Sequence, residues 1–460
     1  MNHIEQLRSI LGEFLITDPT SKIPYSRDAS YLPGLEPLAV AIPRDTEQLS
    51  KITRICYENE IRITPRGGGT SLTGSSIPTE ESIVISFARM NRILEINTAD
   101  RYVLVESGTR LDELNARLSS MGFMYPPDPG SSIAATVGGS ISTNAGGLKG
   151  VSYGTTKEWV LGLELVLADG SIVSTGGKVL KRSDGYDLTA LVIGSEGTLA
   201  LIAKAYLKIT TKPESVGRIL AFYEDVEQAA HSISALKERG ITPLIAEFVD
   251  RLAMHSMKLA GGLEFPQESG GMIIVDVQST RESLGRHLDE SLRVINSTDP
   301  ISSRIITDEA EMSKISQLRK GLYSSELRLR GRSSETVLTG DIVVPTSQMG
   351  KALKEIRGVA DSLKVSLFGH AGDGNIHANV FFDAENADEG KMAIDYLENI
   401  GRIAVKYGGC ISAEHGIGLE KKALFIEEME SRGSTRPLEL MKCVKQVFDP
   451  KGILNWGKIF

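Results

Sequence analysis

The sequence predicts an α+β protein of two domains, and three observations lead to that prediction. The chain has 460 residues, which is more than one domain usually contains. Up to residue 212, short β-like runs alternate with glycine-rich turns, whereas from residue 213 onward strands alternate with longer helical segments. The hydrophobic fraction of 41% and the charged fraction of 24% are those of an ordinary globular protein, so each domain can bury a core.

The first half is predicted to be a strand-rich domain with one clear amphipathic helix. Residues 45–61 form that helix, with Asp45 as its N-cap and Leu49, Ile52 and Ile55 on its apolar side. The helix leads into a strand that ends in a glycine-rich loop. Further strand-like runs occupy residues 82–87, 101–109, 161–175 and 197–211.

The second half is predicted to be a separate α+β domain of about 200 residues. Strands are expected at residues 217–225, 245–250, 272–278 and 339–345, and a strand hairpin at 366–382. Helices are expected at residues 226–240, 282–295, 308–330, 347–363 and 390–407.

The composition argues against several classes of protein. A net charge of −8 disfavours nucleic acid as the main partner, because phosphate binding needs a basic face. No run is apolar for the roughly 20 residues that a membrane-spanning helix needs. The cysteines Cys56, Cys410 and Cys443 are scattered and no CxxC occurs. We therefore expect no disulfide framework, iron–sulfur cluster or attached haem.

The N-terminal residues predict an amphipathic helix, with apolar side chains at positions 4, 7, 11 and 14. Glu5, Arg8 and Glu13 exclude the apolar core of a signal peptide. We therefore expect a cytoplasmic protein. A peripheral contact of this helix with a membrane surface is the less favoured alternative.

The loop "PRGGGTSLTG" at residues 65–74 has the composition of an anion-binding nest. Consecutive glycines let backbone N–H groups converge on a group such as a pyrophosphate, and Thr70 and Ser71 add hydroxyl donors. A flexible loop is the alternative for a lone glycine triplet. No GK[ST] follows, so this is not a Walker loop, and a Rossmann site also fits badly because its fingerprint should open a helix.

Two further glycine-rich segments accompany this loop. Residues 128–154 contain seven glycines, and small Ser, Thr, Ala and Asn residues lie between them. Residues 193–202, "IGSEGTLALI", add two more glycines beside Glu196. Such segments let backbone approach a large flat ligand closely. Because each segment lies between strand-like runs, linkers do not explain them.

The stretch "SLFGHAGDGNIHANVFF" at residues 366–382 predicts a hairpin whose turn is "AGDGN". Alternation along the second strand places His377 and Asn379 on one face, and His370 at the end of the first strand can lie across from them. Two imidazoles with Glu414 form a plausible zinc-type ligand set. The alternative is that both histidines only satisfy hydrogen bonds in a polar turn. A calcium loop fits poorly because Ala378 stands where its glycine is required.

Taken together, these motifs resemble one known family. "PRGGGTSLTG", "DPGSS…TVGGSISTNAGG…YG" and "IGSEGTLALI" are similar to the FAD-binding domain of the vanillyl-alcohol oxidase / p-cresol methylhydroxylase superfamily. "GHAGDGNIHANV", "SAEHGIG" and "FDPKGILNWGKIF" resemble its D-2-hydroxyacid dehydrogenase branch, which includes D-lactate dehydrogenases, glycolate oxidase flavoprotein subunits and D-2-hydroxyglutarate dehydrogenases. The resemblance extends from about residue 20 to the C-terminus.

The resemblance implies how the chain is divided. Residues 1–212 would form a two-part FAD-binding domain, and residues 213–425 an α+β substrate domain, or cap, with an antiparallel sheet and the metal site. Residues 426–460 would return to the FAD-binding domain.

The resemblance also implies an FAD whose pyrophosphate lies on the loop 66–74. No His or Cys occurs in residues 65–74 or 128–154, so we expect the FAD to be noncovalent. The implied cofactor-binding residues are Pro65, Arg66, Gly67, Gly68, Gly69, Thr70, Ser71, Gly74, Pro129, Gly130, Ser131, Ser132, Thr136, Gly138, Gly139, Thr143, Asn144, Gly147, Tyr153, Gly154, Glu196, Gly197 and Ile202.

For the reaction itself, His370, His377 and Glu414 match the family's metal ligands. Zinc is the first expectation, with manganese and iron as alternatives. His415 would be the base that accepts the hydroxyl proton, since an imidazole can do so at neutral pH; a structural role is the alternative. By the same resemblance, Asn379 would hydrogen-bond the substrate. Arg319 would bind the substrate carboxylate; its alternative is a solvated helix arginine.

These implications predict an FAD-dependent dehydrogenase for a small D-2-hydroxy acid. Thr339 stands where D-2-hydroxyglutarate dehydrogenases carry a lysine, which favours D-lactate or glycolate over D-2-hydroxyglutarate. The electron acceptor would be external: a quinone, a cytochrome, an electron-transfer flavoprotein, an iron–sulfur subunit or oxygen. An oligomer is also compatible with the sequence. The alternatives are a D-2-hydroxyglutarate dehydrogenase, an FAD-dependent alkyl transferase of the same superfamily, and a non-catalytic flavoprotein subunit.

Overall fold

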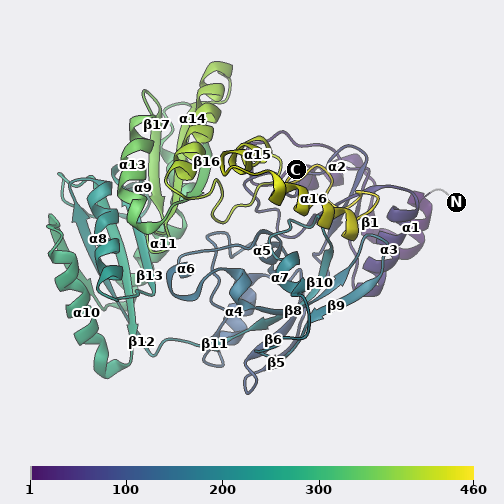
Figure 1. Ribbon diagram of the computed structural model, residues 1–460, viewed down its shortest axis with the longest axis horizontal. Coiled ribbons are helices and arrows are strands. Elements are labelled where there is room, and N and C mark those ends of the chain that lie inside the picture. The colour runs from purple at the N-terminus through teal and green to yellow at the C-terminus, as the bar shows by residue number, and fades with distance from the viewer. Residues whose placement is uncertain (1–2) are drawn as a thin grey trace. The chain divides into compact units, whose positions relative to one another are not determined.

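The structure, a computed structural model, describes residues 3–460 and divides the chain into two compact units (Figure 1). The first unit comprises the chain up to residue 146 together with 155–212 and 414–460, and the second comprises 147–154 and 213–413. The change near residue 213 is where the sequence texture predicts it. Two parts differ from the predicted division: residues 147–154 join the second unit, and the last segment begins at 414 rather than 426.

Hydrogen bonds explain both differences. Within the second unit, the Ser152 hydroxyl donates to the carbonyl of Pro243 at 2.7 Å, and the Tyr153 hydroxyl donates to Gln278 at 3.0 Å. Within the first unit, the backbone N–H groups of residues 419 and 420 donate to the carbonyl of Thr73. A division made from the sequence alone does not see these bonds, because the partners are far apart in the chain.

The first unit contains two larger sheets and one strand pair. In the four-stranded sheet, β2 and β3 lie parallel to β4, and β1 pairs antiparallel with β2. The five-stranded sheet has the order β5-β6-β10-β8-β9 and is antiparallel throughout. The strands are β1 (Leu15–Ile16), β2 (Ala39–Ala41), β3 (Arg62–Arg66), β4 (Ser82–Ser86), β5 (Ile93–Asn97), β6 (Tyr102–Glu106), β7 (Phe123–Met124), β8 (Val160–Val166), β9 (Ile172–Gly176), β10 (Leu201–Lys208) and β11 (Thr210–Thr211).

The helices of the first unit include the two that the sequence predicts at its start. The Asp45 carboxylate accepts from the N–H of Gln48 at 2.8 Å and caps α3, whose Leu49, Ile52 and Cys56 are buried in the core. The helices are α1 (His3–Leu11), α2 (Pro19–Lys22), α3 (Thr46–Glu58), α4 (Leu111–Ser119), α5 (Val137–Thr143), α7 (Leu188–Val192), α15 (Lys422–Ser431) and α16 (Arg436–Phe448), with short 3-10 turns η1 (Gly12–Phe14), η2 (Ile23–Tyr25) and η3 (Thr156–Trp159).

The C-terminal residues return to the four-stranded sheet of the same unit. The N–H of Ile63 in β3 donates to the carbonyl of Ile453 at 2.7 Å, and the N–H of Asn455 donates back to the carbonyl of Ile63 at 2.8 Å. The side chain of Asn455 also donates to the carbonyls of Ser75 and Glu196. The tail therefore adds bonds beside the glycine loop that follows β3.

The second unit is built on one seven-stranded antiparallel sheet, which is the sheet type expected for this domain. Its strand order is β15-β12-β14-β13-β17-β18-β16. The strands are β12 (Ser215–Tyr223), β13 (Ile245–Asp250), β14 (Gly271–Ser279), β15 (Ser302–Ile306), β16 (Glu335–Val343), β17 (Lys364–Gly369) and β18 (Asn375–Asp383).

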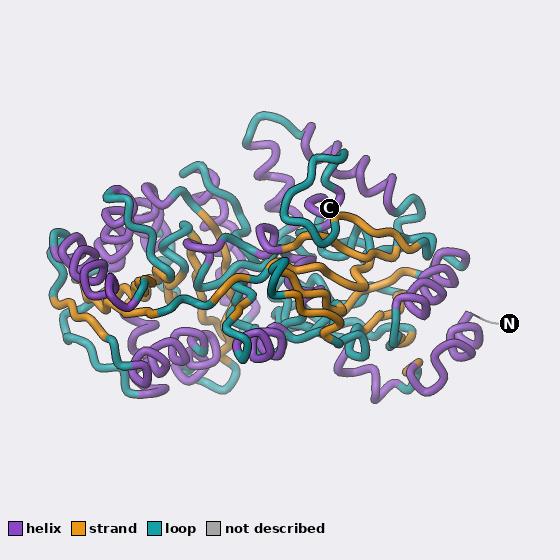
Figure 2. The backbone as a smooth tube through the Cα atoms, turned by 90° about the horizontal axis from the view of Figure 1, so that it is seen from below, coloured by secondary structure: helices purple, strands orange, loops and turns teal. Residues whose placement is uncertain are grey.

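Helices cover the two faces of this sheet unequally. One face packs on α8, α10, α13 and α14 and forms the larger core, and the other packs on α9, α11 and α12. Figure 2 shows helices in purple and strands in orange. The helices are α6 (Gly150–Tyr153), α8 (Val226–Glu238), α9 (Arg251–Gly261), α10 (Arg281–Asn296), α11 (Glu309–Lys320), α12 (Leu322–Glu326), α13 (Met349–Gly358) and α14 (Ala387–Lys406), with 3-10 turns η4 (Leu327–Leu329) and η5 (Thr346–Gln348).

Several helices depart from the sequence prediction. The long helix expected at residues 308–330 is broken at Gly321, where α11 ends and α12 begins. The helix expected at residues 347–363 ends earlier, at Gly358. Conversely, the glycine-rich segment contains α5, which the sequence does not predict. The Thr136 hydroxyl caps α5 by accepting from the N–H of Gly139 at 3.2 Å.

Candidate active site

A row of side chains crosses the sheet of the second unit at His377. In the antiparallel register this residue of β18 pairs with Asp341 of β16 and with Phe368 of β17. Because side chains alternate between the faces of a strand, this row lies opposite the apolar core that contains Ala378. Nδ1 of His377 lies 3.7 Å from Oδ1 of Asp341, and its ring centroid lies 5.4 Å from that of Phe368.

His370 follows β17 directly and lies beside His377. The ring centroids are 5.3 Å apart and nearly perpendicular, and one ring nitrogen of each residue lies within 4.8 Å of the other. Nδ1 of His370 lies 2.6 Å from Oε1 of Glu247, a fully buried residue of β13. With a carboxylate at Nδ1, the lone pair of Nε2 is the one left for a metal. Two buried imidazoles in this arrangement fit a divalent metal.

Arg319, at the end of α11, reaches the same carboxylate from the other side. Its Nη2 lies 2.6 Å from Oε2 of Glu247, and its guanidinium carbon lies 4.8 Å from the ring centroid of Phe368. The side chain is 6% exposed, whereas Arg328 and Arg330 nearby are exposed. A solvated helix arginine is therefore not what the structure shows.

A buried ion pair holds α11 against the sheet. The guanidinium of Arg218 in β12 lies 2.6 Å from Asp276, donates to the carbonyl of Met312 at 2.8 Å, and donates to the Ser316 hydroxyl at 2.9 Å. Both acceptors in α11 precede Arg319 by one or two helical turns. Arg218 therefore fixes the helix that presents Arg319.

A second row of polar side chains crosses the sheet at Asn379. It pairs with Thr339 of β16 and Ser366 of β17. The amide nitrogen of Asn379 and the hydroxyl of Ser366 both donate to the carboxylate of Glu326, at the end of α12. Among the described residues, neither Oδ1 of Asn379 nor Oγ1 of Thr339 has a hydrogen-bond partner, although both atoms are buried.

Glu326 itself has an unusual charge environment. Burial raises the pKa of its carboxyl to about 7, and the hydrogen bonds from Asn379 and Ser366 oppose that rise. The nearby charge of Asp250 adds to the rise, and that of Arg319 opposes it. The sequence reasoning missed Glu326, because it stands among several charged residues and no periodicity singles it out.

In the first unit, the glycine loop after β3 presents a series of free donors. Among the described residues, the backbone N–H groups of residues 67–72 have no hydrogen-bond acceptor. The Ser71 hydroxyl accepts from the N–H groups of Thr73 and Ser75 at 3.2 and 3.1 Å. These two bonds fix the turn that follows the glycines. Consecutive free N–H groups form a nest for an anion, so the loop fits the pyrophosphate of a dinucleotide.

Two glycines let this loop lie against the second glycine-rich segment. A Cβ on Gly68 would lie 2.1 Å from the carbonyl oxygen of Ala134, and a Cβ on Gly67 would lie 2.3 Å from Oγ1 of Thr136. The two segments therefore form one continuous backbone surface that larger residues would break. Ser107, on which Gly138 packs, has a buried hydroxyl with no partner among the described residues.

Comparison with known proteins supports this interpretation. The family model described as FAD linked oxidases, C-terminal domain, matches residues 212–459, and the model described as FAD binding domain matches residues 37–176. The chain belongs to the FAD-linked oxidases. This confirms the predicted family, its FAD cofactor and the enzyme class.

Individual proteins agree with the family assignment. The glycolate oxidase subunit GlcD of Bacillus subtilis is 35% identical, covering 99% of this chain and 96% of that protein. A D-lactate dehydrogenase of Archaeoglobus fulgidus is 33% identical, covering 92% and 91%. A solved structure of p-cresol methylhydroxylase with substrate bound has a TM-score of 0.79 at 17% identity, covering 99% of this chain and 96% of that one. That likeness confirms the predicted fold.

In this FAD-linked oxidase, several predicted cofactor residues have structural partners. The Glu196 carboxylate accepts from the Ser75 hydroxyl at 2.6 Å and from the N–H groups of Ile417 and Gly418 at 2.7 and 2.9 Å. The Arg66 guanidinium donates to the carbonyls of Arg27 and Pro24 at 2.7 and 3.1 Å. Gly147, Tyr153 and Gly154 belong to the second unit, whereas the other predicted cofactor residues belong to the first.

Glu414 and His415 open the last segment of the first unit. Oε1 of Glu414 lies 3.8 Å from Nε2 of His415, and the carbonyl of His415 accepts from the Thr73 hydroxyl at 3.2 Å. Directly before them in the chain, the N–H of Ala413 donates to Oδ2 of Asp341 at 3.0 Å within the second unit. After them, the N–H groups of Ile417 and Gly418 donate to Glu196. Hydrogen bonds therefore hold the chain on both sides of Glu414 and His415.

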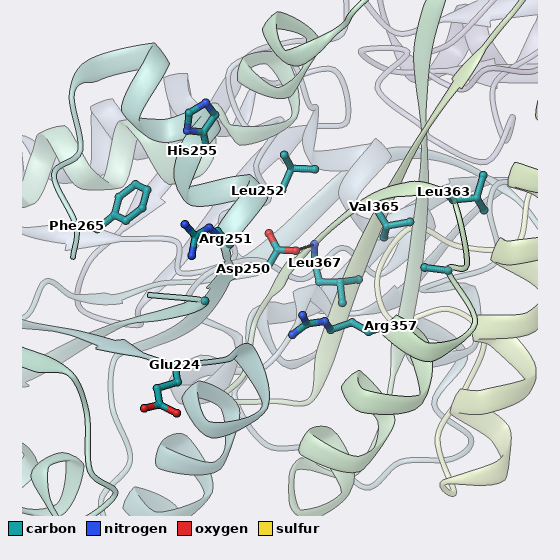
Figure 3. Close-up of a pocket in the computed structure, with 12 residues that line it drawn as sticks. Glu224, Asp250, Arg251, Leu252, His255, Phe265, Arg357, Leu363, Val365 and Leu367 are labelled. Carbon is teal, nitrogen blue, oxygen red and sulfur yellow. Dashed lines mark hydrogen bonds between the residues drawn. The ribbon is translucent and has the colours of Figure 1, made fainter. Parts of the chain in front are cut away.

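The second unit of this oxidase also contains a cavity of about 650 Å³, and no predicted site residue lines it (Figure 3). Its lining includes Asp250, Arg251, His255, Phe265, Arg357 and Leu367. The Asp250 carboxylate accepts from the N–H of Leu367 at 2.9 Å, and burial raises its pKa to about 6.

In the described part of the chain, every helix is too short or too polar to cross a membrane.

Proposed function

We propose that this protein is a dehydrogenase that oxidises a small D-2-hydroxy acid, D-lactate or glycolate, to the 2-oxo acid. The observation that carries the proposal is the face of the second unit where His377 lies beside His370, and where Glu247 contacts both His370 and the buried Arg319. A 2-hydroxy acid presents a hydroxyl for a metal and a carboxylate for a guanidinium. The names of the relatives, glycolate oxidase subunit and D-lactate dehydrogenase, support the same substrate class.

The protein residues divide the work by their chemistry. Arg319 binds the substrate carboxylate through the guanidinium donors that Glu247 does not occupy. His370, His377 and Glu414 hold the metal, for which zinc is proposed; when bound, it lowers the pKa of the substrate hydroxyl. A ring nitrogen of His415 takes the hydroxyl proton. Asn379 hydrogen-bonds the substrate, and Thr339, which carries no charge, leaves no counterion for a second carboxylate.

The cofactor is proposed to be noncovalent FAD. The N–H groups of residues 67–72 bind its pyrophosphate, and residues 134–139 form the adjoining surface. When bound, the flavin accepts the hydride that leaves the substrate Cα as the hydroxyl proton departs. The scattered cysteines of this chain predict neither an iron–sulfur cluster nor an attached haem. The electrons are therefore proposed to pass to an external acceptor.

Anaerobic reduction of the flavin tests the proposal. D-lactate or glycolate should bleach the flavin absorbance of the purified protein, and L-lactate should not. Chelation should abolish the bleaching, and added Zn²⁺ should restore it. If D-2-hydroxyglutarate alone bleaches the flavin, the substrate assignment is wrong. If none of these acids does so in the metal-loaded protein, the alkyl transferase or the non-catalytic subunit replaces the dehydrogenase.

A further inference from the structure

Glu247 lies between two residues that the proposed function uses for different purposes. Its Oε1 is 2.6 Å from Nδ1 of His370, a proposed metal ligand, and its Oε2 is 2.6 Å from Nη2 of Arg319, the proposed substrate arginine. Its side chain is completely buried, and Arg319 and His370 are 6% and 8% exposed. Glu247 comes from β13, distant in sequence from both partners. One carboxylate thus contacts an imidazole through one oxygen and forms an ion pair with a guanidinium through the other.

The charges fix which nitrogen of His370 carries the proton. Oε2 of Glu247 forms an ion pair with the Arg319 guanidinium, and a carboxylate in an ion pair only accepts hydrogen bonds. At 2.6 Å, Nδ1 of His370 must therefore be the donor. In the neutral imidazole that binds a metal, the remaining nitrogen, Nε2, then carries the lone pair.

We propose that Glu247 is a positioning residue that selects the metal-binding tautomer of His370 and, with its other oxygen, orients Arg319. This inference rests on the proposed function, since it assumes a metal at His370 and a substrate carboxylate at Arg319. It assigns to one buried side chain the link between the metal site and the site that recognises the carboxylate. Glu247 itself binds neither ligand.

Glu247→Gln is the diagnostic variant, because an amide of the same size has only one acceptor oxygen. Arg319 is always charged and carries only donors, so the amide oxygen must face it. The amide NH₂ then faces Nδ1 of His370, which has to become an acceptor. The proton moves to Nε2, and the metal loses that ligand atom. Metal binding should therefore fail while Arg319 keeps its partner.

The control is Glu326→Gln, the same chemical change at another buried carboxylate of the same unit. Glu326 bonds Ser366 and Asn379 and neither histidine, so this variant should bind metal as the unmodified protein does. Glu247→Ala removes both acceptor oxygens. It should weaken metal binding and carboxylate binding together, which separates the two roles.

The experiment uses the full chain loaded with FAD, stripped of metal, and titrated with Zn²⁺. Glu247→Gln should bind Zn²⁺ on the order of 10–100-fold more weakly than the unmodified protein. Long-range ¹H–¹⁵N spectra of histidine-labelled protein should show an Nδ1 proton in the unmodified protein and an Nε2 proton in the variant. Calorimetric titration with propionate, a carboxylate without a hydroxyl, should give nearly the same affinity in Glu247→Gln and about tenfold weaker binding in Glu247→Ala.

The outcomes separate this inference from the proposed function. Unchanged Zn²⁺ affinity or an unchanged tautomer in Glu247→Gln overturns the positioning role, and so does failure of the unmodified chain to bind Zn²⁺. A visible flavin spectrum and an unchanged melting temperature identify folded variants. If Zn²⁺ and tautomer behave as expected but no 2-hydroxy acid bleaches the flavin, the proposed reaction fails and the role of Glu247 remains.

Discussion

Arg319 stands out among the arginines near it because its guanidinium is buried and paired. A lysine at this position keeps the charge but loses the planar fork that binds a carboxylate with two parallel bonds. We expect Arg319→Lys to raise KM for D-lactate on the order of tenfold to a hundredfold while the flavin spectrum stays unchanged. Arg328→Lys, at an exposed position of the same segment, should leave KM within about twofold. Equal KM values for the two variants would contradict the role of Arg319.

Glu326 makes the stability of the protein depend on pH in an unusual direction. Burial raises the pKa of its carboxyl in the folded chain to about 7, above its ordinary value of 4.5. The folded state therefore holds the proton more tightly, so the free energy of unfolding falls as pH rises from about 4.5 to 7 and levels off above that. The change should reach about 3 kcal/mol, and Glu326→Gln should remove it. Urea unfolding at several pH values measures both curves; parallel curves would refute this account.

Individual residues were predictable from the sequence only where a local pattern marked them. Alternation along a single strand is enough to put His377 and Asn379 on one face. Glu247 and Glu326 carry no such signal, because each meets its partners through pairing of distant strands and helices. The burial of Arg319 likewise depends on Arg218, about a hundred residues away in the chain, and no spacing rule connects the two.

At the scale of elements, local chemistry predicted the starts of helices better than their lengths. Asp45 caps α3, and the "AGDGN" turn joins β17 to β18, as the sequence suggested. The break at Gly321 was not predictable, because an isolated glycine inside a helical pattern is tolerated and need not end the helix. Helix α5 forms among glycines because the segment packs against Ser107, a contact that propensity does not contain.

Glu196, from a turn of the same unit, holds two residues of the segment 415–418. That carboxylate accepts from two N–H groups of the segment and from Ser75. We expect Glu196→Ala to speed amide exchange at Ile417 and Gly418 by about tenfold or more, because each loses its acceptor. Ser75→Ala removes only the hydroxyl and should leave those two amides nearly as protected. Slow exchange in Glu196→Ala would show that other contacts hold the segment.

At the scale of the whole molecule, the family resemblance and the fold lead to the same assignment. The glycine-rich motifs that carry the resemblance are also the places where two stretches of backbone lie close together in the fold. The first unit keeps glycine where backbone must approach backbone, and the second keeps an antiparallel sheet with polar side chains on part of one face.

A noncovalent FAD adds its binding free energy to folding, so free FAD should raise the melting temperature. Acid precipitation should release the flavin into the supernatant; flavin retained in the pellet would indicate a covalent bond instead.

Gly68→Ala tests whether the close approach of the two glycine-rich segments sets FAD affinity. A Cβ at Gly68 would lie 2.1 Å from the carbonyl of Ala134, so the loop must move and the N–H groups of residues 67–72 lose their convergence. We expect the variant to bind FAD at least tenfold more weakly and to lose the stabilisation that FAD gives. Gly285→Ala in α10 of the second unit is the control, because a Cβ there meets no atom within 4 Å and the residue is not among the implied FAD-binding residues. FAD titration of both apoproteins measures the difference, and equal affinities would mean that the pyrophosphate binds elsewhere.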